Sequence, residues 1–544
     1  MERKQISAKG KGIQYKKYWN TCVGAGRAAE GLRTKWQEQL ETAVQECGFQ
    51  YIRFHGLLCD EMGIYKKKKE KETYNYAYVD MLFDALLKMK IRPFVEFGFM
   101  PEDLASGEGT QFWWKGNVTP PKDYAAWGRL LENLITHWIE RYGIEEVQEW
   151  YFEVWNEPNL SAFWKGTKTQ YFELYKVSAK AVKRVSEKLR VGGPATSNFV
   201  PDTRFDGETE NFSVHKTHLV EDLQSLEWKG VWLEDFLEYC EKENLPVDFV
   251  STHPYPTDFA LDGQEGNQCM RGRSRYVHST RDDLQWIHRL VKESAYPHAE
   301  IHLTEWSSSP TSRDYSHDSL PAATYIVKCN LEAVNLVDSL SYWTFTDIFE
   351  EAGLGPEAFH GGFGLMNMNG IKKPSYHAYR FLNQLGNTML LQTENLVVTR
   401  NETGKIRALF YNYPDEIEQT VPISEYPTLD VIEKIENSGS EKKIELDIID
   451  LQKGDIFVTE ILSTDSGDVM ERWKVYGKPQ NLNRIQERNL MKLSENLKTD
   501  TMKVTENGIL HLELILKPWE IVLLEQLSES DSVALSENPV KAKP

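Results

Sequence analysis

Long apolar runs are missing from this sequence. No stretch of about 18 apolar residues, the length that a membrane-crossing helix needs, occurs anywhere in its 544 residues. The basic residues of MERKQISAKGKGIQYKKYW are not followed by an apolar segment, so an export signal is not expected either. We therefore expect a protein that has no contact with membranes and works in the cytoplasm.

Cysteine and positive charge are both in short supply. The six cysteines form no C-x-x-C pair, so they match neither the spacing of a zinc site nor a disulfide framework, and reduced thiols are expected. With 63 Lys and Arg against 82 Asp and Glu, the net charge is −19, and a general basic surface for nucleic acid is excluded. The basic run KKKKEKE at 66–72 is a local exception, which we interpret as the solvated tip of a hairpin.

Short β-rich runs alternate with longer helical patterns from about residue 15 to residue 380. Between the runs, segments such as 123–143 and 169–189 repeat apolar residues every three or four positions, as amphipathic helices do. Repeated βα units of this kind favour the α/β class and a closed (β/α)8 TIM barrel rather than an open sheet. The expected barrel strands are 17–24, 49–56, 92–98, 149–158, 190–195, 246–256, 299–307 and 339–347.

The pattern changes after about residue 385. Alternating or apolar strands separated by turn residues predict an accessory antiparallel β-sandwich. A helical insertion is expected near 481–500, and the final residues are polar enough to be disordered. The expected domains are an N-terminal segment at 1–14, the catalytic barrel at 15–380, the sandwich at 381–527 and a tail at 528–544.

Two of the expected barrel strands end in a glutamate beside aromatic residues. Strand four ends in Asn156-Glu157-Pro158, and strand seven ends in Thr304-Glu305-Trp306. Barrel enzymes place their chemistry at the carboxyl ends of the strands. Two carboxylates that arrive from different strands can flank a glycosidic bond, one protonated to assist the leaving oxygen and one ionised to attack the sugar. A single strand-end glutamate is usually a surface group, but the repetition of the design favours a functional pair.

These strings also carry a family resemblance. VWNEPNL and LTEWSSS resemble the acid/base and nucleophile motifs of the glycosidase superfamily named for strands four and seven. YWNTCVGAGR, YIRFHGLLCDEMGIY and FTDIFEEAG, in that order, resemble glycoside hydrolase family 39, which contains β-xylosidases and α-L-iduronidases. The resemblance implies a barrel with an accessory β-sandwich, a retaining mechanism, and no metal or organic cofactor. It also implies that segment 1–14 packs on the sandwich.

The resemblance assigns roles to three residues. Glu157 would protonate the leaving group and then activate water, and Glu305 would form the covalent glycosyl-enzyme. Asn156 would donate a hydrogen bond to the sugar 2-hydroxyl, although its side chain could instead cap the turn into Pro158. A retaining mechanism predicts that the two carboxyl groups are about 5 to 5.5 Å apart.

Further residues at the same strand ends are candidates for sugar binding. His55 and His253, at the ends of strands two and six, are expected to hydrogen-bond ring hydroxyls, although a lone histidine is more often structural. Tyr255 is expected to orient the nucleophile or touch the ring oxygen. Trp343 offers a flat face to a pyranose ring or simply packs in the core. We expect one of Glu350 and Glu351 to bind the distal hydroxyls of the terminal sugar.

A neutral sugar suits this site better than a uronate. In the family that this sequence resembles, iduronidases have a lysine soon after the histidine of strand six, whereas this chain has Pro254, Tyr255 and Pro256 there. Acidic residues at 350 and 351 would also repel a uronate. We therefore expect an exo-acting, retaining β-D-xylosidase that releases xylose from short xylo-oligosaccharides.

Three alternatives remain open. One is an endo-acting, xylanase-like barrel glycosidase, although the loops 101–122 and 256–280 look suited to closing a pocket. Another is an α-L-iduronidase or α-L-arabinosidase of the same family, and the least favoured is a carbohydrate-binding protein without catalysis. The expected partner is a small β-xyloside, and a homo-oligomer is possible.

Overall fold

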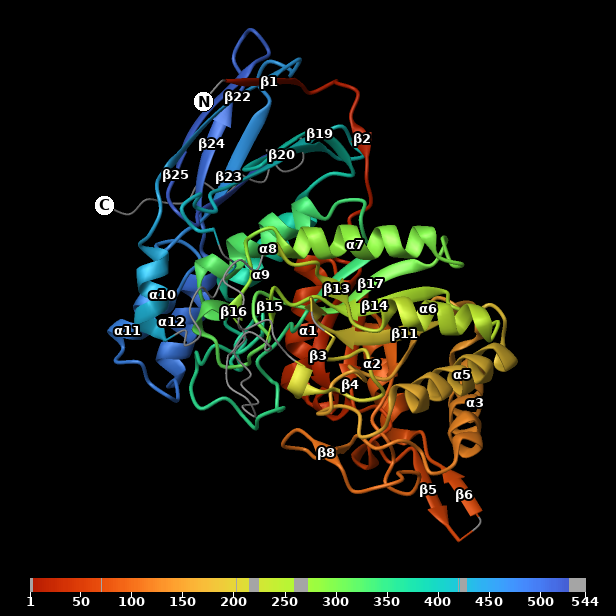
Figure 1. Ribbon diagram of the computed structural model, residues 1–544. Coiled ribbons are helices and arrows are strands. Elements are labelled where there is room, and N and C mark those ends of the chain that lie inside the picture. The colour runs from red at the N-terminus through yellow and green to blue at the C-terminus, as the bar shows by residue number, and fades with distance from the viewer. Residues whose placement is uncertain are drawn as a thin grey trace.

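The barrel predicted from the sequence is present in the computed structural model. This structure describes residues 3–69, 71–201, 203–214, 225–258, 273–418, 420 and 428–527, so the expected tail at 528–544 lies outside the described residues. Eight parallel strands close on themselves at the centre of the molecule (Figure 1). They are β3 (Cys22–Arg27), β4 (Tyr51–His55), β7 (Arg92–Phe97), β10 (Tyr151–Val154), β11 (Arg190–Ser197), β14 (Phe249–His253), β17 (Glu300–Trp306) and β18 (Ser339–Tyr342).

One long helix follows each barrel strand and covers the outside. Two of them show how the sequence sets their limits: Asp123 caps the start of α3 through Ala126 N, and Thr167 forms a capping box with Gln170 at the start of α5. The helices are α1 (Thr34–Cys47), α2 (Ala77–Lys88), α3 (Tyr124–Tyr142), α5 (Lys168–Val185), α6 (Leu233–Lys242), α7 (Ser279–Glu293), α8 (Leu320–Glu332) and α9 (Pro374–Gln384), with a short α4 (Ile144–Val147) after α3.

Aromatic side chains fill one end of the barrel and charged side chains occupy the other. The apolar cluster at the amino ends of the strands contains Cys22, Tyr51, Phe94, Tyr151 and Phe249. Two residues further along these strands, the next positions that point into the barrel are mostly occupied by buried polar side chains. Apolar side chains therefore fill the barrel at the amino ends of the strands, and polar side chains that could take part in a reaction lie at the carboxyl ends.

The C-terminal module consists of two facing sheets whose apolar sides form a separate core. The larger sheet has the order β2 (Ile13–Gln14), β19 (Thr388–Thr393), β20 (Leu396–Arg400), β21 (Ile406–Tyr411), β26 (Ile521–Gln526), β23 (Ile456–Leu462) and β24 (Lys498–Lys503). The smaller sheet has the order β1 (Lys4–Ser7), β22 (Lys442–Ile449) and β25 (Leu510–Leu516).

Helices lie beside these sheets, next to the barrel (Figure 1). The helix expected near 481–500 is α12 (Arg484–Glu495), and Lys498 already begins the next strand. Two helices were not expected from the sequence, α10 (Leu429–Glu436) and α11 (Met470–Val475). Trp473 on α11 and Leu490 on α12 pack with Phe359 and Ile371 of the chain that follows β18. The buried residues of α10, Ile432 and Ile435, belong to the large core cluster of the barrel.

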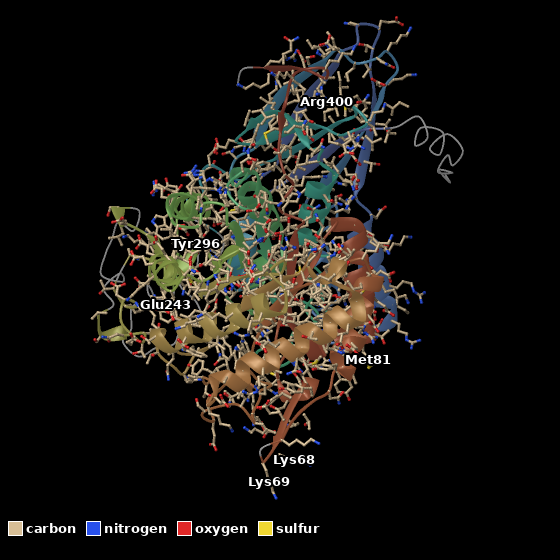
Figure 2. The ribbon with its side chains drawn as sticks, turned by 90° about the vertical axis from the view of Figure 1, so that its right-hand side faces the viewer. Lys68, Lys69, Met81, Glu243, Tyr296 and Arg400 are labelled. Atoms are coloured by element: carbon tan, nitrogen blue, oxygen red, sulfur yellow. The ribbon has the colours of Figure 1, made fainter. Side chains whose placement is uncertain are left out.

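The first residues of the chain belong to the sandwich although the barrel follows them. Strand β1 pairs in parallel with β22, and β2 pairs with β19. Arg400, labelled high in the module in Figure 2, donates to the carbonyl oxygens of Ala8 and Gly10 at 2.8 and 3.0 Å. A Cβ at Gly12 would lie 2.5 Å from the carbonyl oxygen of Met389, so only glycine fits this crossing.

Short hairpins decorate the barrel. The basic run forms the hairpin β5 (Tyr65–Lys68) and β6 (Lys71–Tyr74), whose tip at Lys68 and Lys69 is the point of the molecule farthest from the sandwich in Figure 2. The loop 101–122 contains the hairpin β8 (Thr110–Gln111) and β9 (Gly116–Asn117). The remaining pairs are β12 (Phe199–Val200) with β13 (Lys229–Gly230), and β15 (Thr257–Asp258) with β16 (Arg273–Ser274). Most of the loop 256–280 lies outside the described residues.

Candidate active site

A single buried arginine organises the carboxyl ends of the strands. Arg53 on β4 has no exposed surface, and its guanidinium contacts four side chains. Nε donates to Glu153 Oε2 at 2.5 Å, and Nη1 donates to Glu305 Oε1 at 2.7 Å. Nη2 donates to Asn156 Oδ1 at 2.9 Å and lies 3.0 Å from Glu96 Oε2. Arg53 therefore ties four strands together at the level where the candidate catalytic residues stand.

Glu157 follows β10 in an unusual backbone conformation. Its φ of 45° lies in the left-handed region, which a non-glycine residue adopts at a cost of about 1–3 kcal/mol, often at functional sites. The surrounding structure holds this conformation, because its backbone N–H donates to Ala195 O at 2.8 Å and Asn159 bonds to both backbone groups of Ser197. The side chain is 8% exposed, and burial raises the pKa of Glu157 to about 7. A carboxyl group in this state can deliver a proton near neutral pH.

Glu305 is the penultimate residue of β17 and has different partners from Glu157. Arg53 donates to its Oε1, and the Tyr255 hydroxyl donates to its Oε2 at 3.1 Å. Burial holds the pKa of Tyr255 well above its ordinary value, so this residue remains a donor. Glu305 therefore accepts hydrogen bonds at both oxygens, one of them from a cation, whereas Glu157 lies against a ring nitrogen of His253.

The two carboxyl groups are close to each other. Oxygen atoms of Glu157 and Glu305 and a ring nitrogen of His253 all lie within 4.8 Å of one another. Retaining glycosidases hold their carboxyl groups about 5 to 5.5 Å apart, whereas inverting enzymes need about 6.5 to 9.5 Å for an intervening water. The spacing fits the retaining arrangement.

His253 at the end of β14 makes other contacts than the expected ones. Nδ1 lies 2.9 Å from Glu157 Oε1, and Nε2 lies 3.1 Å from Thr304 Oγ1. The ring has no exposed surface. Both nitrogens therefore have protein partners, and the hydrogen bond to a sugar hydroxyl that we expected from sequence is replaced by a contact to the candidate acid.

His55 and Asn156 each leave one polar group for a ligand. His55 Nδ1 contacts Glu96 Oε2 at 2.6 Å, while Nε2 faces Glu305 Oε1 at 3.5 Å and Glu351 Oε1 at 3.7 Å. Burial lowers the pKa of His55 to about 4, so the ring is neutral in this setting. The oxygen of Asn156 accepts from Arg53, which directs its amide NH2 elsewhere and fits the proposed donation to a sugar hydroxyl.

The structure separates Glu350 from Glu351. Glu350 accepts hydrogen bonds from Arg27 and Arg33, and although burial opposes it, these bonds lower the pKa of Glu350. Glu351 faces His55, and among the described residues it has no arginine or lysine within ion-pair distance. Burial raises the pKa of Glu351 well above its ordinary value, with the charge of Glu305 adding to the effect. Of the two, Glu351 therefore keeps a carboxyl group without a cationic partner among the described residues, whereas Glu350 is paired with two arginines.

Aromatic rings surround His55. The ring of Trp343 lies 4.8 Å from that of His55 and is only 2% exposed, and Phe112 and Phe99 stack at 5.8 Å. Trp343 is therefore an enclosed wall of the site rather than an open platform. Phe112 comes from the β8–β9 hairpin, and the neighbouring Trp113 N donates to Glu351 O, which fastens this loop across the strand ends.

Glu157, His253 and Glu305 also have the ligand types of a divalent cation site. Both oxygens of Glu305 accept from Arg53 or Tyr255, and a cationic guanidinium beside the site disfavours a second cation. The donor set therefore fits acid/base and nucleophilic chemistry better than metal binding.

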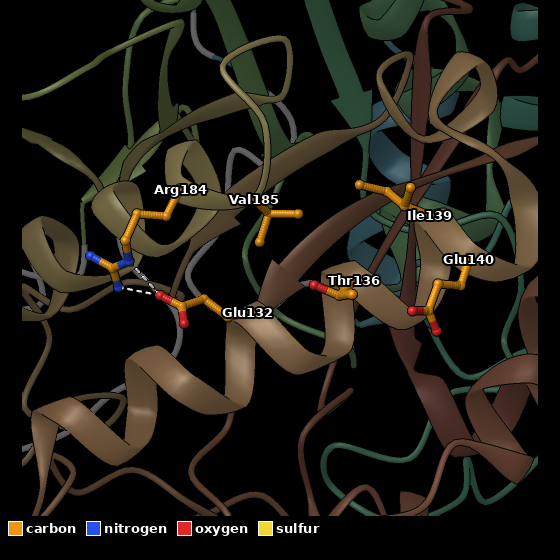
Figure 3. A pocket seen from close by; sticks show the side chains of 6 residues that line it. All are labelled: Glu132, Thr136, Ile139, Glu140, Arg184 and Val185. Carbon is orange, nitrogen blue, oxygen red and sulfur yellow. Dashed lines mark hydrogen bonds and ion pairs between the residues drawn. The ribbon is translucent and has the colours of Figure 1, made fainter.

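A second hollow lies on the outer layer of helices, between α3 and α5 (Figure 3). Glu132 and Arg184 form an ion pair across it, so its most polar pair is already satisfied. It is far from the strand ends and offers no pair of carboxyl groups in contact. Its lining residues are Glu132, Thr136, Ile139, Glu140, Arg184 and Val185.

Sequence reasoning missed four members of the site. Arg53, Glu96 and Glu153 are charged residues inside largely apolar strands, and Thr304 precedes the candidate nucleophile Glu305. All four are buried. The signal was present, because a charge in the middle of a buried strand requires a partner, but the partner cannot be read from the sequence.

Comparisons with known proteins identify the family of the chain. The profile described as "Glycosyl hydrolases family 39" matches residues 3–221 and 224–510. The chain is 37% identical over 518 residues to the "Beta-xylosidase" of Geobacillus stearothermophilus, covering 94% of this chain and 93% of that protein. A GH39 enzyme from Xanthomonas axonopodis pv. citri has a TM-score of 0.82 at 30% identity, covering 96% of this chain and 97% of that one. A monomeric beta-xylosidase from Caulobacter crescentus CB15 has a TM-score of 0.80 at 30% identity, covering 96% and 99%.

Proposed function

The chain belongs to glycosyl hydrolase family 39 and is a glycoside hydrolase, and from this premise we propose that it is a retaining, exo-acting β-D-xylosidase. The observation that carries the mechanism is the close pair of carboxyl groups, whose atoms lie within 4.8 Å of each other, with burial raising the pKa of Glu157 and Arg53 bound to Glu305. The full-length similarity to β-xylosidases supports the choice of sugar.

The reaction proceeds by double displacement. A carboxylate oxygen of Glu305 attacks the anomeric carbon while Glu157 donates its proton to the leaving oxygen, and the glycosidic C–O bond breaks. Glu157, now ionised, then removes a proton from a water molecule that attacks the same carbon and releases Glu305. Arg53 and Tyr255 orient Glu305, and Asn156 donates to the sugar 2-hydroxyl.

The surroundings support a neutral terminal sugar. His55 Nε2 and Glu351 face the same space and can hydrogen-bond hydroxyls. No lysine directly follows His253, the last residue of β14. The hairpin β8–β9, fastened through Trp113 N to Glu351 O, supports an enclosed site rather than a long groove. These features favour release of single xylose units over internal cleavage of chains.

Location and assembly are separate proposals. Within the described residues no helix is long and apolar enough to cross a bilayer. Five cysteines are free and buried, which supports a reducing compartment, and we propose the cytoplasm. A homo-oligomer remains a proposal that sedimentation of the purified protein tests.

Initial rates on matched aryl glycosides test the function. We expect the β-D-xyloside to be cleaved faster than the α-L-arabinoside, β-D-glucoside and α-L-iduronide. Proton NMR of the first product should show the β-anomer of xylose, as retention requires. Dominant iduronide cleavage, or an α-anomer as first product, would overturn the proposal. Products from xylohexaose separate the modes, since an exo-acting enzyme releases xylose from the first minutes.

A further inference from the structure

His253 is held through both of its ring nitrogens. Nε2 lies 3.1 Å from Thr304 Oγ1, and Nδ1 lies 2.9 Å from Glu157 Oε1. A neutral imidazole has one N–H, so it donates at one nitrogen and accepts at the other. The nitrogen that carries the hydrogen therefore decides which protonation state of Glu157 the ring supports.

Thr304 determines the direction of this chain of hydrogen bonds. Its single hydroxyl hydrogen is donated to Glu153 Oε1 at 2.8 Å. Although burial opposes it, the charge of Arg53 keeps the pKa of Glu153 below its ordinary value, so Glu153 is an ionised acceptor. Thr304 Oγ1 can then only accept from His253, which places the ring hydrogen on Nε2.

We propose that Glu153 and Thr304 fix His253 in the Nε2–H form, so that its bare Nδ1 accepts the proton of Glu157 and keeps this carboxyl group in its acid form until substrate arrives. The proposal rests on the proposed role of Glu157 as general acid. His253 and Thr304 are positioning residues, because they act on the sugar only through Glu157.

The other groups around Glu157 oppose one another. Burial, the largest effect, disfavours its ionised form, whereas a hydrogen bond from Ser197 and the charge of Arg53 favour that form. Negative or potentially negative neighbours favour the proton. They are Glu96 on β7, Glu153 on β10, Glu305 on β17, Tyr255 after β14, and Glu351 after β18. The lone pair of His253 Nδ1, the nearest of these groups, adds to the side that retains the proton.

The ring itself does not take up the proton. Burial lowers the pKa of His253 to about 4, while burial raises the pKa of Glu157 to about 7. In the first step the proton moves from Glu157 to the leaving oxygen as the C–O bond breaks and the bond to Glu305 forms. The resulting carboxylate then faces a nitrogen lone pair, which favours recovery of a proton from the attacking water and restores the initial state.

The substitution Thr304→Val tests this arrangement, because Thr304 acts on the sugar only through His253 and Glu157. It keeps the branched shape but removes the acceptor of the Nε2 hydrogen, so the ring can instead carry its hydrogen on Nδ1 and donate to an ionised Glu157. We expect the alkaline limb of the kcat/KM profile to move down by about one pH unit. Thr304→Ser, which keeps the hydroxyl, should restore the wild-type profile.

Leaving-group dependence separates this role from a merely structural one. At pH values above the shifted alkaline limb, the loss of kcat/KM in the valine variant relative to wild type should be about tenfold greater on phenyl β-xyloside than on 2,4-dinitrophenyl β-xyloside, whose leaving group needs no proton. An unmoved alkaline limb, or equal losses on both substrates, would overturn the proposal. If the valine variant does not fold, Thr304→Ala makes the same comparison.

The controls distinguish this proposal from the proposed function. A wild-type protein that cleaves no xyloside, or a Glu157→Gln variant that cleaves phenyl β-xyloside at the wild-type rate, would refute the function of Glu157 itself. Normal wild-type cleavage and a Glu157→Gln defect, together with an unmoved limb in Thr304→Val, would refute only the role of His253 and Thr304.

Discussion

Replacing Glu157 by glutamine should make the protein more stable at alkaline pH while it impairs catalysis. The side chain is 8% exposed, and burial raises its pKa in the folded protein to about 7 against an ordinary value of 4.5. A group whose pKa is raised by folding contributes stability fully below the lower value and loses it as the pH rises through the higher one. Between pH 5 and pH 8 the wild type should therefore lose about 2 to 3 kcal/mol through this residue.

The measurement compares the free energies of unfolding of wild type and Glu157→Gln at the two pH values. Glutamine has the same shape and does not titrate, so other titrating groups cancel in the difference between the proteins. Urea unfolding followed by tryptophan fluorescence is suitable, because most of the fully buried tryptophans lie in the barrel. Glu241→Gln, at an exposed position on α6, is the matched control and should show no such dependence on pH.

A difference between wild type and variant that stays the same at pH 5 and pH 8 would refute the reasoning. It would mean that the buried carboxyl group ionises in the folded protein as easily as in the unfolded chain. A variant that is less stable at pH 8 than at pH 5, relative to wild type, would reverse the sign and indicate that the charge of Glu157 is stabilised.

Three further outcomes follow from the site. The kcat/KM of the wild type on phenyl β-xyloside should fall above about pH 7, because Glu157 must be protonated, and a pH–rate profile checks this. Glu351→Gln should raise the KM for xylobiose about tenfold with little change in melting temperature, which steady-state kinetics measures. Glu350→Gln should instead lower the free energy of unfolding by about 1–3 kcal/mol, because it weakens the ion pairs with two arginines, and urea unfolding measures this loss. Tyr255→Phe should reduce kcat about tenfold to a hundredfold through loss of its bond to Glu305, and an unchanged kcat would contradict that contact.

Much of the fold was visible in the sequence because local patterns dictate it. Each expected barrel strand overlaps an observed one, since buried parallel strands read as apolar runs bounded by helical patterns. The start of β3 at Cys22 falls later than expected, because the aromatic residues before it pack in the core without joining the sheet. Helices α10 and α11 were not predicted, because they are short and their buried residues pack in two different clusters, α10 in the barrel core and α11 in the cluster around Trp473.

That the two glutamates lie close together was predictable for a different reason, because Glu157 follows β10 and Glu305 lies near the end of β17, in a fold that gathers the carboxyl ends of its strands in one place. The partners of the site were not predictable, since they are far apart in sequence. Thr304 lies 51 residues beyond His253, and Arg33 lies 317 residues before Glu350. Sequence alone therefore could not tell that His253 contacts the acid, or that Glu350 is neutralised and Glu351 is not.

The pairing of β1 with β22 and of β2 with β19 makes the barrel an insertion within the sandwich. During synthesis these first strands are made long before their partners, so the smaller sheet cannot form until the barrel has left the ribosome. Modular exchange is constrained in the same way: cutting the chain at one point between barrel and sandwich leaves the larger sheet without an edge strand and Arg400 without its carbonyl partners. Grafting this accessory module onto another barrel therefore requires two junctions rather than one.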